Sequence, residues 1–342
     1  MKECTIIDQA SNERKLKHNY VFFFANSDYW RAILGQELYD HPNIKVYNYA
    51  FDGNRFLKYL FRIHWSYSIN KRIRLPFKRI WFKKMYRQSF ADNLPLCFVY
   101  LGVNSIRFDG GFTEYVKKQS SQNRQIILHN DLIAKKCDYD YYSVRNKVDN
   151  ATTYDKGEAE KFGIKYFCET TYSKLLPEPE RAEFRWDVYF LAAAKDRLPK
   201  IIAVYDKLEA EGLNCLFIIC GVNPEDQIQR KGICYSEPIS YEDNIRYVLL
   251  SKCILELIQG GSVDITTRAL EAIAYRRRLL TDCPICEDDY FHPGQLQKFS
   301  SPEEIQSDFI KKALDPEEYM PLLDMNPLNR IYFFEEILGE LS

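Results

Sequence analysis

The amino-acid sequence predicts an α/β protein of two domains. Its 342 residues are too many for one ordinary domain and suit two of about 150. In both halves, short runs rich in Val, Ile, Phe and Tyr alternate with helical patterns, which predicts parallel sheets covered by helices. The halves also differ in charge: residues 1–175 hold 29 Lys and Arg against 18 Asp and Glu, and the remainder holds 18 against 30. This asymmetry indicates two domains, of which the basic N-terminal one faces something anionic.

The first domain is assigned to residues 1–175. Strands are expected where β-branched and aromatic residues cluster between polar breaks. These runs are 20–24, 44–50, 95–101, 125–129, 150–154 and 164–168. Helices are expected over 29–38 and 112–118, and from an Asp155 cap through Phe162.

The domain boundary is placed within 173–186, because this charged stretch contains two prolines and resists both helix and sheet. The second domain is assigned to 183–325, and a C-terminal helix to 326–342. Its expected strands are 187–193, 213–220, 233–239, 253–258 and 278–282, and its expected helices include 197–212, one capped by Ser240, and 266–275. Ser301-Pro302 and Asp315-Pro316 are typical helix starts. These β-α units predict two Rossmann-like domains that face each other across a cleft.

The first candidate ligand loop follows the strand at 187–193 and carries Lys195 and Arg197. In open parallel sheets, ligands bind outside the carboxyl ends of the strands. Two cations beside the start of a helix suit a diphosphate. The alternative is that both side chains are simply solvated.

The second candidate loop runs from Glu256 to Glu271. A buried strand ends there, two glycines allow a backbone to approach a ligand closely, and a helix begins whose N-terminal amides favour an anion. A carboxylate one turn into that helix could accept hydrogen bonds from ribose hydroxyls. The alternative is a glycine-rich loop with a capped helix. Together these features fit a sugar nucleotide, which a transferase would use as its donor. The candidate donor-binding residues here are Glu256, Gln259, Gly260, Gly261, Ser262, Thr266, Thr267, Arg268 and Glu271.

The motifs of 155–310 resemble, in order and spacing, the C-terminal half of bacterial GT-B-fold glycosyltransferases of lipopolysaccharide and capsular polysaccharide biosynthesis. The matching segments are Ala-Lys-Asp-Arg-Leu-Pro, Ile-Ser-Tyr-Glu-Asp, Ser-Lys-Cys-Ile-Leu-Glu-Leu-Ile-Gln, Thr-Thr-Arg-Ala-Leu-Glu-Ala and Arg-Leu-Leu-Thr.

The resemblance implies GT-B architecture and a role for each matching residue. Lys195 and Arg197 would hold the donor phosphates. Thr266, Thr267 and Arg268 would line the pyrophosphate, and Glu271 would bind ribose. Two positions depart from the pattern: Val263-Asp264 stands where a further glycine is frequent, and Arg276-Arg277 where a Gly-Lys pair is common.

The segment 54–90 is basic and aromatic. Between Asp52 and Asp92 there is no acidic residue, but there are eleven Lys or Arg and ten aromatics. Helical spacing puts apolar and basic side chains on different faces, which favours an anionic membrane surface. Core packing is the main alternative, and nucleic-acid binding is favoured less because no nucleic-acid motif accompanies the segment. The candidate membrane or acceptor residues are Arg62, Trp65, Lys78, Arg79, Trp81, Lys83 and Lys84.

An inverting transfer requires a general base from the first domain. The candidates that follow its strands are Asp109, His129 and Asp131. We expect no essential metal and no other cofactor, since the cations and the helix terminus would stabilise the leaving diphosphate.

The predicted function is transfer of a sugar from a nucleotide-sugar donor to a cell-surface polysaccharide or lipid-linked oligosaccharide. Because no signal peptide or apolar span is found near the N-terminus, we expect a cytoplasmic protein, peripheral on the inner face of the membrane. The alternatives are a sugar-nucleotide epimerase, a polysaccharide-modifying phosphotransferase and a non-enzymatic membrane-surface protein.

Overall fold

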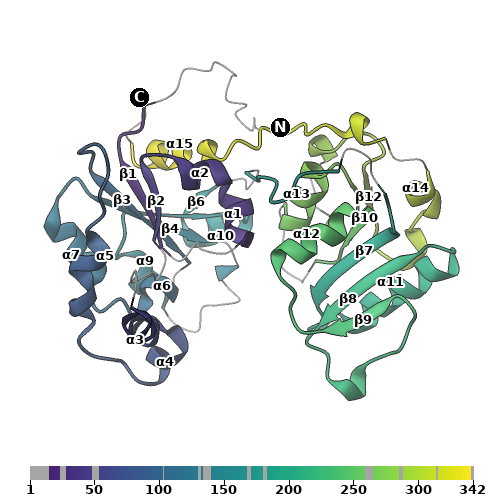
Figure 1. Ribbon diagram of the computed structural model, residues 1–342, viewed down its shortest axis with the longest axis horizontal. Coiled ribbons are helices and arrows are strands. Elements are labelled where there is room, and N and C mark those ends of the chain that lie inside the picture. The colour runs from purple at the N-terminus through teal and green to yellow at the C-terminus, as the bar shows by residue number, and fades with distance from the viewer. Residues whose placement is uncertain are drawn as a thin grey trace.

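A computed structural model shows two α/β lobes, each built round its own six-stranded parallel sheet (Figure 1). The predicted fold class is therefore confirmed. The structure describes residues 15–23, 28–47, 54–102, 104–129, 132–133, 140–167, 171–179, 183–258, 265–284, 288–312 and 315–339.

The N-terminal sheet has the strand order β2-β1-β3-β4-β5-β6. Its strands are β1 (Asn19–Phe23), β2 (Ile44–Tyr47), β3 (Leu96–Leu101), β4 (Arg124–His129), β5 (Asn150–Thr153) and β6 (Lys165–Tyr166). Every residue of β1 is buried, as expected of an apolar strand covered on both faces. Around the sheet lie α1 (Asp28–Leu34), α2 (Gln36–Asp40), α3 (Arg55–Trp65), α4 (Tyr67–Arg72), η1 (Lys78–Trp81), α5 (Phe82–Tyr86), α6 (Asn104–Arg107), α7 (Phe112–Gln119), α9 (Tyr141–Arg145) and α10 (Lys156–Phe162).

The C-terminal sheet has the order β12-β11-β10-β7-β8-β9, so the chain reverses direction across the sheet between β7 and β10. Its strands are β7 (Trp186–Ala193), β8 (Cys215–Cys220), β9 (Ile233–Ser236), β10 (Ser251–Glu256), β11 (Arg278–Thr281) and β12 (Leu296–Lys298). The helices are α11 (Leu198–Ala210), η2 (Pro224–Asp226), α12 (Tyr241–Leu249), α13 (Thr267–Ala274), η3 (Asp288–Tyr290), η4 (Pro302–Glu304), α14 (Ser307–Lys311) and η5 (Pro316–Tyr319). The two proline-led helix starts thus yield only short 3-10 turns.

The helix predicted over 29–38 is two helices, α1 and α2, separated at Gly35. This glycine has φ +84°, and a Cβ at its position would lie 2.1 Å from Cγ of Pro327. The helical pattern of the sequence does not indicate this break, because the residue that packs closely against Gly35 is Pro327, near the other end of the chain.

The last helix, α15 (Leu328–Ile337), lies on the N-terminal lobe, where Ile331 and Phe334 join the core formed by β1 and β3 (Figure 1). Its buried Glu335 accepts a hydrogen bond from the backbone N–H of Lys17 at 2.9 Å. Arg330, also buried, donates to Oγ1 of Thr171 at 2.7 Å. The chain therefore returns to its first lobe after building the second.

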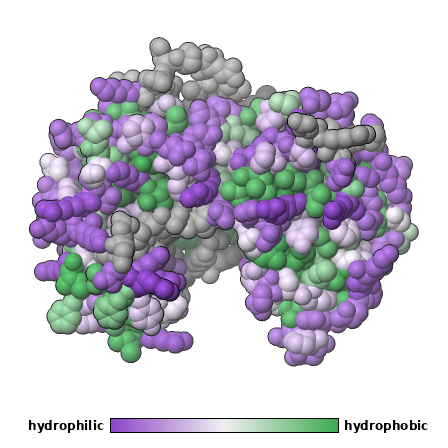
Figure 2. Space-filling model, in the orientation of Figure 1, coloured by the Kyte–Doolittle hydropathy of each residue, from purple (hydrophilic) through white to green (hydrophobic). Residues whose placement is uncertain are grey.

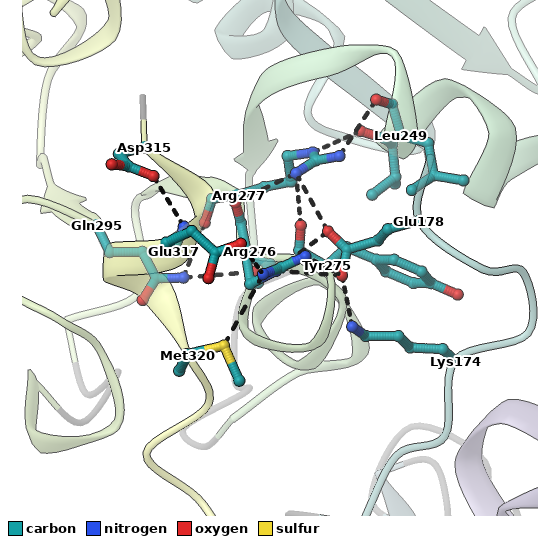
Figure 3. Close-up of polar contacts among 12 residues, drawn as sticks. Lys174, Glu178, Leu249, Tyr275, Arg276, Arg277, Gln295, Asp315, Glu317 and Met320 are labelled. Carbon is teal, nitrogen blue, oxygen red and sulfur yellow. Dashed lines mark hydrogen bonds and ion pairs between the residues drawn. The ribbon is translucent and has the colours of Figure 1, made fainter. Parts of the chain in front are cut away.

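The stretch between the lobes is anchored to the end of α13 (Figure 3). Glu178 forms ion pairs with Lys174 at 2.5 Å and with Arg276 at 3.1 Å. Arg276 has φ +53°, the left-handed conformation that commonly ends a helix and favours glycine. Arg276 therefore holds a conformation that glycine adopts more easily.

The predicted placement of Trp65 and Trp81 on a membrane-facing side is wrong. Both rings are buried in the core of the N-terminal lobe, where Trp65 stacks on Phe61 at 5.1 Å and Trp81 donates to Nδ1 of His64 at 2.8 Å. Lys78 is buried as well, whereas Arg62, Arg79, Lys83 and Lys84 are exposed. The helical periodicity identified an apolar face of the helix, but it could not show whether that face packs in the core or faces a membrane.

A different set of apolar side chains is exposed on the same segment. Its members lie on α3, on α4, in the turn between α4 and η1, and on η1. Figure 1 places α3 and α4 at the lower left, where Figure 2 shows exposed apolar surface. The members are Phe56, Tyr59, Ile69, Ile73, Phe77 and Ile80. We call these six residues the apolar rim.

Candidate functional site

A cavity of about 860 Å³ lies outside the carboxyl ends of β7 and β10. This is the point where the strand order reverses, which is where open parallel sheets bind their ligands. Both lobes contribute to the lining. It is formed by Tyr29, Leu132, Tyr154, Phe190, Leu191, Ala192, Lys195, Arg197, Tyr241, Leu255, Glu256, Leu257, Ile258, Thr266, Thr267 and Arg268.

The N-terminus of α13 opens into this cavity. Thr266 caps the helix, and its hydroxyl oxygen accepts hydrogen bonds from the backbone N–H groups of Arg268 at 3.1 Å and Ala269 at 3.4 Å. The same hydroxyl donates to the carboxylate of Glu256, and Thr281 donates to the other Glu256 oxygen at 2.5 Å. Glu256 therefore ties the end of β10 to α13, and burial raises the pKa of its carboxyl.

Arg268 is held by a buried acid. Its guanidinium forms an ion pair with Glu271, one turn later, and donates to the backbone carbonyl of Leu191 at 3.3 Å. Burial lowers the pKa of Arg268, but the attraction of Glu271 outweighs this and holds the pKa above its ordinary value. The side chain is therefore a fixed positive charge on the cavity wall.

Glu271 does not line the cavity. It is fully buried, and besides Arg268 it accepts hydrogen bonds from the Tyr241 hydroxyl at 2.8 Å and from Nδ2 of Asn244 at 3.1 Å. This geometry differs from the ribose contact that the resemblance implies. In the structure, Glu271 orients Arg268 and α12 rather than facing the cavity.

Lys195 and Arg197 both line the cavity, on the loop after β7. Arg197 donates to the backbone carbonyls of Leu257 and, at 2.7 Å, of Ala193, so it joins the loops that follow β7 and β10. Burial lowers the pKa of its guanidinium. Lys195 is exposed and has φ +48°. Together with Arg268 these residues make the cavity basic, since its only described carboxylate is that of Glu256.

Tyrosines join the two lobes at the site. The ring of Tyr29, on α1, meets the ring of Tyr241 edge-on at 5.4 Å, and its hydroxyl lies 3.4 Å from Oγ1 of Thr267. Tyr241 in turn contacts the hydroxyl of Tyr172 at 3.0 Å. Sequence reasoning missed these residues. Tyr241 follows directly on the predicted Ser240 cap, which was a usable signal, whereas nothing near Tyr29 indicated its role.

The two base candidates that the structure describes, Asp109 and His129, do not line this cavity. Asp109 is buried and accepts hydrogen bonds from the N–H of Thr113 at 2.9 Å and its hydroxyl at 2.8 Å. His129 is buried beside the hydroxyl of Tyr141, and burial lowers its pKa to about 3. Asp131 lies outside the described residues, as do Gln259, Gly260, Gly261 and Ser262.

Within the described residues, no group of three or more His, Cys, Asp or Glu side chains could hold a metal ion. In the same part of the chain, no helix has the length and apolar character to cross a membrane.

No protein-family model and no curated protein matches this sequence. Solved structures match over nearly the whole chain. An α-glucosyltransferase in complex with UDP and a 13-mer DNA aligns with TM-score 0.53 and 9% identity, over 93% of this chain and 94% of that one.

Two further structures align at lower TM-scores. T4 phage BGT in complex with UDP-glucose gives 0.45, at 10% identity, over 93% and 98% of the two chains. The UDP-GlcNAc 2-epimerase of Neisseria meningitidis bound to UDP-GlcNAc gives 0.46, at 13% identity, over 94% and 99%. At 9% identity, the match with TM-score 0.53 shows the fold alone, which is a two-domain α/β architecture.

Proposed function

We propose that this protein is a glycosyltransferase whose nucleotide-sugar donor binds in the cavity outside the carboxyl ends of β7 and β10. The observation that carries the proposal is Arg268 at the N-terminus of α13, held as a fixed cation on the cavity wall by the buried Glu271. A helix N-terminus and a fixed guanidinium are well suited to a diphosphate, because both present N–H donors and positive charge.

In this proposal the basic cavity stabilises the leaving group. Breaking the bond between sugar and diphosphate leaves negative charge on the diphosphate oxygens. Arg268, Lys195 and the positive end of the α13 dipole would stabilise that charge without rearranging, which lowers the barrier of the transfer. Arg197 would contribute mainly by joining the two loops. We therefore expect no requirement for a metal ion.

The acceptor is proposed to be a cell-surface polysaccharide or a lipid-linked oligosaccharide, met at the inner face of the membrane. The apolar rim supports this location, since six exposed apolar side chains share the segment 54–90 with exposed basic residues such as Arg79 and Lys83. Exposed aromatic and aliphatic groups beside cations suit an anionic bilayer surface.

The test is the release of nucleoside diphosphate from UDP-, GDP-, CDP- and dTDP-sugars, with and without a bacterial lipid extract. A transferase releases the diphosphate from one donor and does so faster with the extract. Arg268→Met should remove the release, whereas Arg246→Met, at an exposed position of α12, should keep it. Conversion of a UDP-sugar into its epimer without an acceptor would instead identify an epimerase. No turnover of any donor contradicts the proposal.

A further inference from the structure

A second cavity, of about 460 Å³, lies wholly within the N-terminal lobe. It is bounded by α4, η1, the loop that follows β3, and α9. Four of its lining side chains are basic, and among the described residues its only carboxylate is Asp109. The basic residues are Arg74, Lys78, Arg107 and Lys147.

The carboxylate is already engaged. Besides Thr113, Asp109 accepts a hydrogen bond from the N–H of Gly111 at 3.2 Å and forms an ion pair with Lys147 at 3.1 Å. Within the described chain, neither Arg74 nor Lys78 forms an ion pair. Among the described residues, Arg74 and Lys78 therefore add positive charge to the cavity wall without an acidic side chain paired to either.

Lys78 is built into the wall. Its side chain is 5% exposed, and its ammonium donates to the backbone carbonyl of Phe108 and lies 5.5 Å from the ring of Trp65. A Cβ at Gly110 would lie 2.9 Å from Cβ of Lys78, so the loop after α6 accommodates this lysine only because that position is glycine. Burial, and the neighbouring Lys147, lower the pKa of Lys78 to about 8, against the opposing effect of Asp109. A bound anion would favour the charged form.

This second cavity lies at the carboxyl ends of the strands of the N-terminal sheet. The first cavity, proposed above to bind the donor and called here the donor cavity, also meets the sheet at that end. Arg107 and Asp109 come after the carboxyl end of β3, and α9 comes after β4. The donor cavity is lined from this sheet by Tyr29, Leu132 and Tyr154, which come after β1, β4 and β5. Carboxyl ends of parallel strands share one edge, so both cavities belong to it.

The cavity also adjoins the apolar rim. Arg74 and Lys78 lie on the same turn of chain as Ile73 and Phe77, whose side chains are exposed. A ligand that enters here meets cations inside and apolar groups outside. That combination fits an amphiphile with an anionic headgroup.

We propose that this cavity binds the phosphate or diphosphate headgroup of a lipid acceptor, while the apolar rim contacts the surrounding bilayer. The inference rests on the proposed transferase function and names the group by which the acceptor is recognised. Arg74, between α4 and η1, and Lys147, after α9, would reach the phosphate oxygens together with the buried Lys78.

The test compares vesicles that differ in headgroup. Vesicles of phosphatidylcholine with phosphatidic acid, which exposes a phosphomonoester, are set against vesicles with phosphatidylglycerol, adjusted to the same surface potential. We expect the full-length protein to cosediment several-fold more strongly with phosphatidic acid. The double variant Arg74→Gln/Lys147→Gln should lose this preference.

The matched control is Arg79→Gln/Lys83→Gln. It also removes two positive charges, but from residues of the segment 54–90 that do not line the cavity. It should weaken binding to both kinds of vesicle alike and keep the preference. Equal sedimentation with both vesicles, or a preference that survives in the cavity variant, would overturn the proposal. A duplex oligonucleotide that displaces the protein from phosphatidic acid, and whose own binding needs Arg74 and Lys147, would overturn it in favour of nucleic acid.

Nucleoside diphosphate binding, measured on the same samples, separates this inference from the proposed function. If a nucleotide binds to wild type and to the cavity variant while no headgroup preference exists, only the lipid-phosphate site is contradicted. If no nucleotide binds but the preference is found, the donor site fails and the headgroup site stands as a phosphate-binding site.

Discussion

The fully buried carboxylate of Glu271 forms an ion pair with the guanidinium of Arg268, one turn earlier on α13, and so holds a cation at the wall of the cavity between the lobes. Removing one partner of such a pair leaves the other charge buried and uncompensated, which is costly. Removing both charges together need not be costly. This asymmetry allows stability and ligand binding to be tested separately.

Arg268→Met should lower the free energy of unfolding by about 3 kcal/mol, because Glu271 loses its counter-charge. Arg268→Met/Glu271→Gln should recover most of this loss, since glutamine can still accept from Tyr241 and Asn244. Urea unfolding of the three proteins, followed by fluorescence, measures the difference. If the double variant is no more stable than Arg268→Met, the pair does not have the role described.

Lowering the pH should destabilise the protein through His129. Its pKa falls from 6.5 in the unfolded chain to about 3 in the folded one, because the imidazole is buried. The folded state therefore resists protonation, and stability present above pH 6.5 is lost as the pH falls toward 3. The loss is of order several kcal/mol. His129→Gln should remove part of it in unfolding curves recorded from pH 7 to pH 4. An unchanged pH dependence in the variant would contradict the assignment.

Gly35→Ala should destabilise the contact between α15 and the N-terminal lobe. The new Cβ meets Pro327, and the residue must also keep a positive φ. Gly212→Ala is the matched control, because it too has a positive φ but no atom within 4 Å of the added carbon. The control should cost about 1 kcal/mol from backbone strain alone, and Gly35→Ala clearly more. Equal melting temperatures for the two variants would show that Pro327 moves aside freely.

The apolar rim predicts a membrane contact that does not depend on the buried tryptophans. Ile73→Gln/Phe77→Asn should weaken cosedimentation with anionic vesicles about tenfold or more without lowering the melting temperature, because both side chains are largely exposed. Asparagine suits Phe77, which has φ +62°. Ile228→Gln, an exposed residue of the other lobe, is the control. Vesicle binding that is unchanged in the double variant would exclude the rim as the contact.

Much of the fold could be predicted because the strands are strongly apolar. The expected runs at 95–101 and 187–193 match β3 and β7 within one residue at each end. By contrast, β12 has only three residues, too few to form a recognisable run. Such a strand is defined by its pairing with β11 rather than by its own composition.

The site could be predicted in part, for a related reason. The spacing of Thr266, Arg268 and Glu271 follows from helix geometry. By contrast, the hydrogen bonds that Glu271 accepts come from Tyr241 and Asn244, which belong to a different helix, α12. Contacts of this kind are set by packing between elements, and local sequence does not encode them.

The most direct test of the central claim is calorimetric titration of UDP, GDP, CDP and dTDP into the wild-type protein and into Arg268→Met/Glu271→Gln. We predict saturable binding of at least one nucleoside diphosphate to the wild type, weakened about tenfold or more in the double variant, since a charge-assisted hydrogen bond contributes about 1.5–3 kcal/mol. Absence of binding by the wild type, or equal binding by a folded double variant, would contradict a donor site at the N-terminus of α13.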